Sequence, residues 1–131
     1  EEEEVLGEKV TRHYNQLVVY KEAYRSSLLV HRLTQDFPKH ELYSLADQWK
    51  RTTRGVCANV AEGYAKQSYS KAEFKRFISI AVGCCVESQV WADYARDLGY
   101  IDIPNHYEIV STYWRIEKML RKLHTRVKSP S

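Results

Sequence analysis

The sequence predicts an all-α protein, an antiparallel up-down-up-down four-helix bundle. Apolar residues recur at spacings of three and four along four long segments, as they do on one face of an α-helix. Short connections that contain proline, glycine or polar residues separate these segments, which is typical of antiparallel neighbours. No run of residues has the alternating pattern of a β-strand.

We expect the helices at residues 18–35, 40–66, 71–98 and 104–128. Pro38 marks the first turn, because the residue before a proline avoids the helical conformation, and Phe37 should fold into the core. Ser70 and Glu73 have the spacing of a capping box at the start of the third helix. Gly99 supplies a C-terminal stop for that helix.

Length and composition are those of one domain of 131 residues. We expect a flexible acidic segment over 1–16, the bundle over 17–128 and a frayed end over 129–131. No uncharged apolar run reaches the roughly 18 residues of a membrane span, so no membrane association is expected. The three cysteines, Cys57, Cys84 and Cys85, make a poor disulfide framework and favour reduced thiols in a cytoplasmic protein.

The motifs of common catalytic sites are missing from the sequence. Its five glycines form neither a phosphate-binding loop nor a dinucleotide-binding fingerprint. No glutamate is followed three residues later by a histidine, the pair that di-iron bundles use. Cys84 and Cys85 are adjacent, so they point in different directions from a helix. We therefore expect no metal, no cofactor and no catalytic residue.

Four polar residues stand near apolar positions of the second and third helices: Arg51, Asn59, Glu62 and Glu87. Buried carboxylates must be paired or protonated. We expect a structural network in which Arg51 or another base pairs with Glu62 or Glu87, within one subunit or between subunits. The alternative is a ligand-binding or catalytic role for this set.

Positive charge is concentrated near the C-terminus. The net charge is +3, and it is +7 without the four leading glutamates. Two groups are candidates for nucleic-acid binding: first Arg115, Lys118, Arg121, Lys122 and Arg126, and second Lys66, Lys71, Lys75 and Arg76, which are interleaved with tyrosines. The alternatives are a solvated helix face whose cations suit the helix dipole, and an ordinary solvated turn.

Several segments together resemble a known family. They are Tyr20-Lys21-Glu22-Ala23-Tyr24, Leu33-Thr34-Gln35-Asp36-Phe37-Pro38, Glu41-Leu42-Tyr43-Ser44-Leu45, Asn59-Val60-Ala61-Glu62-Gly63, Phe77-Ile78-Ser79-Ile80-Ala81 and Leu98-Gly99-Tyr100-Ile101. Over roughly residues 18–125 the sequence is similar to the four-helix-bundle proteins encoded in intervening sequences of 23S ribosomal RNA genes. It departs from the family pattern at Gly55, Cys57, Val82 and Cys84, where serine, proline, arginine and serine are common.

The resemblance implies a left-handed bundle that assembles as a ring-shaped homopentamer and has no established enzymatic activity. A related branch comprises the accessory variability determinants of diversity-generating retroelements, basic pentamers that bind a reverse transcriptase and its template RNA. Tyr20, Tyr24 and Leu28 form a second apolar stripe on the first helix, which independently favours oligomerisation.

Two functions are compatible with these observations. The first is a non-catalytic oligomeric adaptor that binds RNA or a nucleic-acid enzyme, such as a retroelement reverse transcriptase, through a basic surface. The second is a scaffold that binds only proteins through an exposed aromatic surface. An enzyme with a polar pocket around Glu62 and Glu87 is a third reading.

Overall fold

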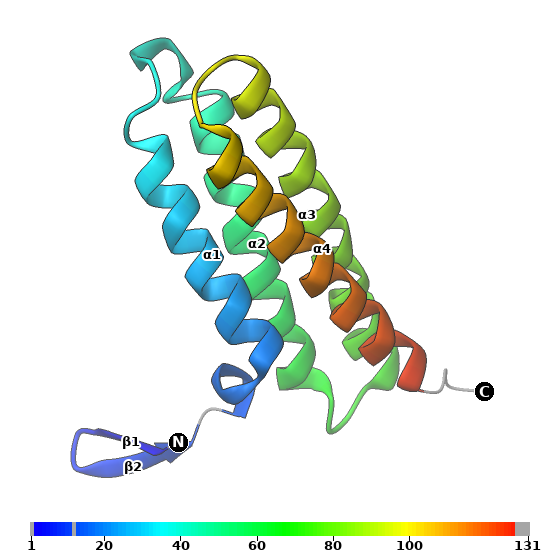
Figure 1. The fold of residues 1–131 in the computed structure, drawn as a ribbon. Helices are drawn as coiled ribbons and strands as arrows, with labels where there is room; N and C mark the ends of the chain where they lie inside the picture. Colours follow the sequence, from blue (N-terminus) through cyan, green and yellow to red (C-terminus); the bar gives the residue numbers. More distant parts are fainter. Residues whose placement is uncertain (1, 12, 128–131) are drawn as a thin grey trace.

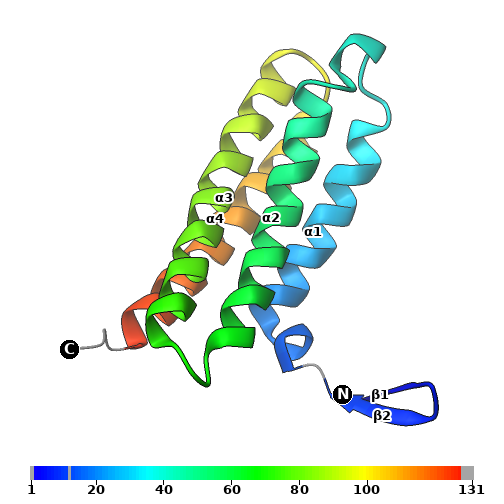
Figure 2. The ribbon, with the colours of Figure 1, turned by 180° about the vertical axis from the view of Figure 1, so that it is seen from behind.

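The computed structural model describes residues 2–11 and 13–127. Four long helices dominate it: α1 (Val18–Thr34), α2 (Leu45–Lys66), α3 (Lys71–Asp97) and α4 (Ile103–Arg126). Figures 1 and 2 show that each helix runs opposite to the one before it and lies beside it. The prediction of an all-α four-helix bundle is confirmed, whereas the left-handed twist stays a prediction.

The inner faces of the helices form one continuous core. Each helix packs on the next in sequence, and α1 closes the bundle against α4. The large side chains that are almost completely buried come from all four helices: Trp49, Tyr113, Phe74, Ile78, Ile109, Ile116, Leu120, Val30, Val56 and Val60. Their spacing of three and four is what the sequence pattern predicted, because such positions share one face of a helix.

The second helix begins later than the sequence predicted, at Leu45 instead of residue 40. Lys39–Glu41 forms a 3₁₀ turn, which the structure labels η2. The Glu41 carboxylate accepts hydrogen bonds from Ser44 Oγ at 2.6 Å and from Tyr100 Oη at 2.8 Å. This side-chain bonding satisfies the turn locally, and the helix starts only after Ser44.

The two other connections follow the predicted capping chemistry. Ser70 Oγ accepts a hydrogen bond from the Glu73 amide at 3.2 Å, so the serine cap of α3 is confirmed. Gly99 has a φ of +79°, and the amide of Tyr100 reaches back to the carbonyl of Ala95 at 2.8 Å. This Schellman motif favours glycine, because side chains disfavour the left-handed conformation. Asp102 then caps α4 by accepting from the Asn105 amide at 2.8 Å.

The N-terminal segment contains structure that the sequence pattern did not indicate. Strands β1 (Glu2–Val5) and β2 (Glu8–Thr11) form an antiparallel hairpin, so the expectation of no strand was wrong. Leu6 and Gly7 connect them with φ values of +53° and +80°, as a two-residue type I′ turn requires. A single glycine after a glutamate run was too weak a signal to predict this turn.

A 3₁₀ helix, η1 (His13–Gln16), follows the hairpin and packs against α1 and α2. The proposed flexibility of residues 1–16 stays a prediction. The expected frayed end at 129–131 lies outside the described residues. Within 2–11 and 13–127, no helix combines the length and apolar character that a membrane span needs. Phe37 is buried, as predicted, and packs against Trp49 and Tyr100.

Candidate functional site

Both groups of candidate nucleic-acid-binding residues extend to the same end of the bundle. The α2–α3 turn and the C-terminal end of α4 lie together there (Figure 1). Lys75 Nζ on α3 donates a hydrogen bond to the Val127 carbonyl just after α4 at 2.8 Å, which ties the two groups together. We call this half of the bundle, residues 13–26, 57–84 and 114–127, the basic end. It contains eleven lysines and arginines and four glutamates.

Several of these cations are already engaged within the chain. Arg121 forms an ion pair with Glu117 at 3.0 Å, and Arg76 forms one with Glu73 at 3.0 Å. The Glu73 carboxylate holds the pKa of Arg76 above its ordinary value, and Arg76 lowers that of Glu73. Neutralised pairs attract a phosphate less than free cations do, so these two arginines contribute less to the surface field.

Two lysines of the candidate groups lie over aromatic rings. Lys118 Nζ lies 4.0 Å from the centroid of the Trp114 ring, a cation–π distance. Lys66 Nζ lies about 6 Å from both the Tyr69 and Phe77 rings. Neither lysine forms an ion pair with another described residue, so its charge is available to an anion.

Three cations of the two candidate groups are exposed and have neither an ion pair nor a cation–π contact with another described residue: Lys71, Lys122 and Arg126. Lys71 also opens α3, where the helix dipole adds partial positive charge. Arg115, in contrast, lies near the middle of α4, and its guanidinium is 3.6 Å from Glu22 on α1. The structure therefore separates Arg115 from Lys122 and Arg126, which lie near the C-terminal end of α4.

The predicted network of Arg51, Asn59, Glu62 and Glu87 does not form within the described chain. Arg51 pairs with Asp47 at 3.2 Å, one turn away on the same helix. Asn59 Nδ2 donates to the Gly55 carbonyl at 2.8 Å, and Glu62 is exposed. The expected pairing of Arg51 with Glu62 or Glu87 was wrong for a single chain, because a nearer carboxylate is available to Arg51.

Glu87 does form a polar contact between α2 and α3, but with different partners. Its Oε1 accepts hydrogen bonds from Thr52 Oγ1 at 2.7 Å and from Trp91 Nε1 at 3.1 Å. The hydrogen bond from Thr52, and to a lesser extent that from Trp91, lowers the pKa of Glu87. Threonine and tryptophan donors at helix positions give no periodic signal, and sequence reasoning missed them.

The cysteines behave as small packing residues. Cys57 and Cys85 are buried, Cys84 is half-buried, and all three thiols are free. Burial raises the pKa of Cys57 to about 11, and burial likewise raises those of Cys84 and Cys85. A raised pKa disfavours the reactive thiolate. Among the described residues, no group of three histidines, cysteines or carboxylates is placed to hold a metal ion.

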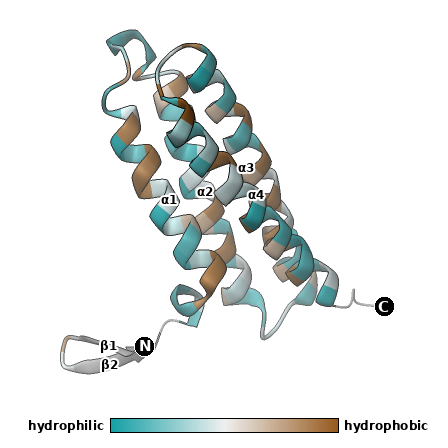
Figure 3. Ribbon diagram, viewed as in Figure 1, coloured by the Kyte–Doolittle hydropathy of each residue, from teal (hydrophilic) through white to brown (hydrophobic). Residues whose placement is uncertain are grey.

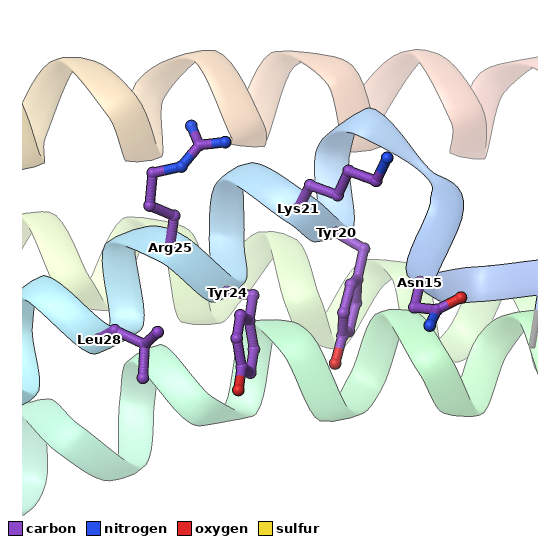
Figure 4. Close-up of a pocket in the computed structure, with 6 residues that line it drawn as sticks. All are labelled: Asn15, Tyr20, Lys21, Tyr24, Arg25 and Leu28. Carbon is purple, nitrogen blue, oxygen red and sulfur yellow. The ribbon is translucent and has the colours of Figure 1, made fainter. Parts of the chain in front are cut away.

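The predicted second apolar stripe of the first helix lies on the surface. Tyr20, Tyr24 and Leu28 border a pocket of about 510 Å³, together with Asn15, Lys21 and Arg25. Figure 4 shows the two tyrosine rings side by side, and their centroids are 6.1 Å apart. Tyr24 is 51% exposed and Leu28 is 43% exposed, which is more than a helix in a self-contained bundle needs to leave in water.

A second exposed apolar stripe, which the sequence analysis did not single out, runs along α3. Its members recur mostly at spacings of four and are each 41–55% exposed: Ile80, Val86, Val90, Tyr94 and Leu98. Brown, hydrophobic segments occur along both α1 and α3 in Figure 3.

The fold and its surface define a class of protein: a small four-helix bundle whose exposed cations and apolar stripes lie outside a fully packed core. The family model described as 23S rRNA-intervening sequence protein matches residues 15–122. The chain belongs to this family.

Among solved structures, the chain is similar to a protein with unknown function from the S23 ribosomal protein family from Bacteroides thetaiotaomicron. The TM-score is 0.73 at 20% sequence identity, covering 82% of this chain and 96% of that chain. At this identity the likeness supports the fold alone. No curated protein matched the chain.

Proposed function

We propose that this protein is a non-catalytic, self-assembling adaptor that binds RNA, or a nucleic-acid enzyme together with its RNA, through the basic end. The observation that carries the proposal is the convergence of cations from α2, α3 and α4 on one end. Lys71, Lys122 and Arg126 are exposed there without a carboxylate partner among the described residues. Single-stranded nucleic acid is bound by such cations together with aromatic rings, which Tyr69 and Trp114 supply, 72% and 51% exposed.

The two apolar stripes support self-assembly. The α1 stripe and the α3 stripe belong to different helices, so they suit a contact in which one face of a subunit meets a different face of the next. Such a contact closes into a ring when the rotation between subunits permits. The resemblance to the family implies five subunits, and a retroelement reverse transcriptase is the nucleic-acid enzyme it suggests.

RNA binding can be tested by fluorescence anisotropy with a labelled single-stranded RNA. We expect binding at low salt that weakens steeply as salt increases, because each phosphate contact releases counterions. The variant K71Q/K122Q/R126Q should bind at least about tenfold more weakly, since it lacks three contacts. The matched control K39Q/K50Q/R51Q removes three cations elsewhere and should bind like the wild type. No binding by the wild type at low salt would exclude the proposal.

Assembly can be tested by light scattering after size-exclusion chromatography. We expect the wild type to exceed the mass of one 15.4 kDa chain. Tyr24→Glu on α1 and Val90→Glu on α3 should each reduce the mass, because a buried charge at an interface is costly. Tyr43→Glu is the control, since Tyr43 is 93% exposed and belongs to neither stripe. A wild-type mass of one chain would contradict self-assembly.

A protein-only scaffold is the second candidate, and one surface favours it. A groove of about 410 Å³ between α2 and α3 is lined by Leu45, Gln48, Trp91, Tyr94 and Leu98, with Glu41 and Ser44 at one end. Apolar and aromatic side chains with few charges suit a protein partner better than RNA. Capture of a protein partner that survives nuclease treatment and is lost with Gln48→Arg, a change in the groove outside both apolar stripes, would favour this function.

A further inference from the structure

A polar groove of about 310 Å³ lies between α1 and α4, and it does not include Lys71, Lys122 or Arg126. Its walls are Glu22, Arg25, Ser26, Leu29 and Arg32 from α1, and Glu108, Thr112 and Arg115 from α4. The α1 members recur at steps of three and four, so they share one face of the helix. The volume reaches the lower limit of small-molecule sites, about 300 Å³.

Arginines approach this groove from both walls. Arg25 and Arg32 are seven residues apart, so both lie on the same side of α1, two turns from each other. Neither side chain forms an ion pair or a hydrogen bond with another described residue. Across the groove, the Arg115 guanidinium is 3.6 Å from Glu22 and 3.4 Å from Thr112 Oγ1, distances at which both contacts are weak.

Three guanidinium groups with spare donors indicate an anionic ligand. Guanidinium presents its N–H groups as a planar fork that matches the oxygens of phosphate, and it stays charged at every physiological pH. Nothing comparable lines the tyrosine pocket on the other side of α1, where Arg25 and Lys21 accompany aromatic and aliphatic side chains.

The other groove residues restrict the ligand further. Ser26 is 6% exposed and Thr112 is half-buried, and both carry hydroxyl groups that can donate to an oxygen. Glu22 and Glu108 add two negative charges to the same walls. A bare anion would be repelled by these carboxylates, whereas the hydroxyl groups of a larger ligand would donate hydrogen bonds to them.

We propose that the α1–α4 groove binds a sugar phosphate unit. Arg25, Arg32 and Arg115 hold the phosphate, and Glu22 and Glu108 accept hydrogen bonds from the sugar hydroxyls. Both a free nucleotide and an RNA chain contain such a unit, so they are two sources of the same chemistry. The site is separate from the cluster of Lys71, Lys122 and Arg126, and it stands whether or not that cluster binds RNA.

Ribose 5-phosphate is the probe that tests the site, with ribose and inorganic phosphate as matched ligands. We expect titration calorimetry to detect ribose 5-phosphate binding, with weaker binding of phosphate and no binding of ribose. Arg25→Gln and Arg32→Gln should each weaken binding by about tenfold, the effect of losing one charged hydrogen bond. The variants should keep the wild-type circular dichroism, because neither side chain bonds to another described residue.

Arg51→Gln is the matched control, because Arg51 is an exposed arginine outside the groove whose partner is Asp47. It should bind ribose 5-phosphate like the wild type. Glu108→Gln separates the two parts of the site: it should weaken ribose 5-phosphate binding but leave inorganic phosphate binding unchanged or stronger. Absence of ribose 5-phosphate binding by the wild type, or equal binding by Arg25→Gln, Arg32→Gln and the wild type, would overturn the proposal.

A competition experiment identifies the source of the unit. If a short single-stranded RNA displaces ribose 5-phosphate from the wild type and from K71Q/K122Q/R126Q alike, the groove takes its phosphate from RNA. If adenosine 5′-monophosphate displaces it and the RNA does not, the groove takes a free nucleotide. Both results support the site, whereas failure of both ligands to displace ribose 5-phosphate would contradict it.

Discussion

The two ends of the bundle use charge in opposite ways. The half that comprises residues 31–50 and 88–111, here called the acidic end, has seven acidic and four basic residues, whereas the basic end has four and eleven. At the acidic end several polar side chains bond to one another: His106 Nε2 lies 2.8 Å from Asp93 Oδ1, and Arg96 pairs with Asp97 at 2.9 Å. The basic end keeps cations that are unpaired among the described residues. Charges that pair within the chain hold turns together, and spare charges are available for a ligand.

The aromatic residues follow the same division. At the acidic end, Phe37 packs between Trp49 and Tyr100, with ring centroids 6.3 and 5.0 Å apart, and Trp49 Nε1 donates to the buried Ser88 Oγ at 3.0 Å. At the basic end, Tyr64 packs edge-on against Phe74 at 5.1 Å, but Tyr64 is only half-buried. The acidic end should therefore be the more stable half of the bundle.

The largest effect on this difference is expected from Trp49→Ala. It removes the largest fully buried side chain and leaves Ser88 without its donor, so it should lower the free energy of unfolding by about 4 kcal/mol. Tyr64→Ala at the basic end should cost less, about 1–2 kcal/mol, because that side chain is only partly buried. Urea denaturation measures both values. Equal losses would mean that the two ends contribute equally to stability.

Two glycines, one at each end of the bundle, sharpen the comparison because their backbone conformations differ. Gly99 at the acidic end has a φ of +79°, so Gly99→Ala should cost about 1–2 kcal/mol through the left-handed conformation. Gly83 lies in the α3 helix with nothing within 4 Å of the position of an added Cβ, so Gly83→Ala should stabilise by about 0.5–1 kcal/mol. Thermal unfolding measures the pair, and opposite signs are the expected result. Destabilisation by Gly83→Ala would place a neighbouring surface against α3.

The sequence predicted the four helices because the core positions repeat at helical spacing over long segments. Ser70 and Gly99 marked helix ends through their local chemistry, and that chemistry is independent of the rest of the fold. The start of α2 was mispredicted because Glu41 bonds to Tyr100, which is 59 residues away. No local pattern carries such a contact.

The candidate site was predictable only in part, for the same physical reason. The number of cations follows from the sequence, but whether each one is paired depends on which carboxylates lie near it in the fold. Arg121 and Arg76 find carboxylates one turn away on their own helices, whereas Arg115 finds Glu22 on α1. The groove around Arg25 and Arg32 was missed, because only packing α1 against α4 brings these arginines near Arg115.

A smaller effect is expected on the pH dependence of stability, through Glu41 at the acidic end. Hydrogen bonds from Ser44 and Tyr100 lower the pKa of Glu41. A lowered folded-state pKa gives stability that is present above the ordinary glutamate pKa of about 4.3 and is lost as the pH falls through the lower folded value. Glu41→Gln should therefore flatten the loss of stability between neutral pH and about pH 3. Denaturation midpoints at several pH values measure this slope.

Glu73→Gln is the matched variant at the basic end, because Arg76 also lowers the pKa of Glu73. If neither variant changed the pH dependence of stability, neither carboxylate would stabilise its turn.

The smallest effect is expected from adding positive charge to the acidic end. Asp36 is exposed there and lies outside the α1–α4 groove, and Asp36→Lys changes the net charge by two units. Charges at the far end act on RNA at the basic end only through solvent, where the screening length is about 8–10 Å at physiological salt. The affinity for RNA should therefore rise by less than about threefold in fluorescence anisotropy, far less than the change produced by K71Q/K122Q/R126Q. A rise as large as that loss would show that RNA responds to total charge, and that the spare cations of the basic end have no special role.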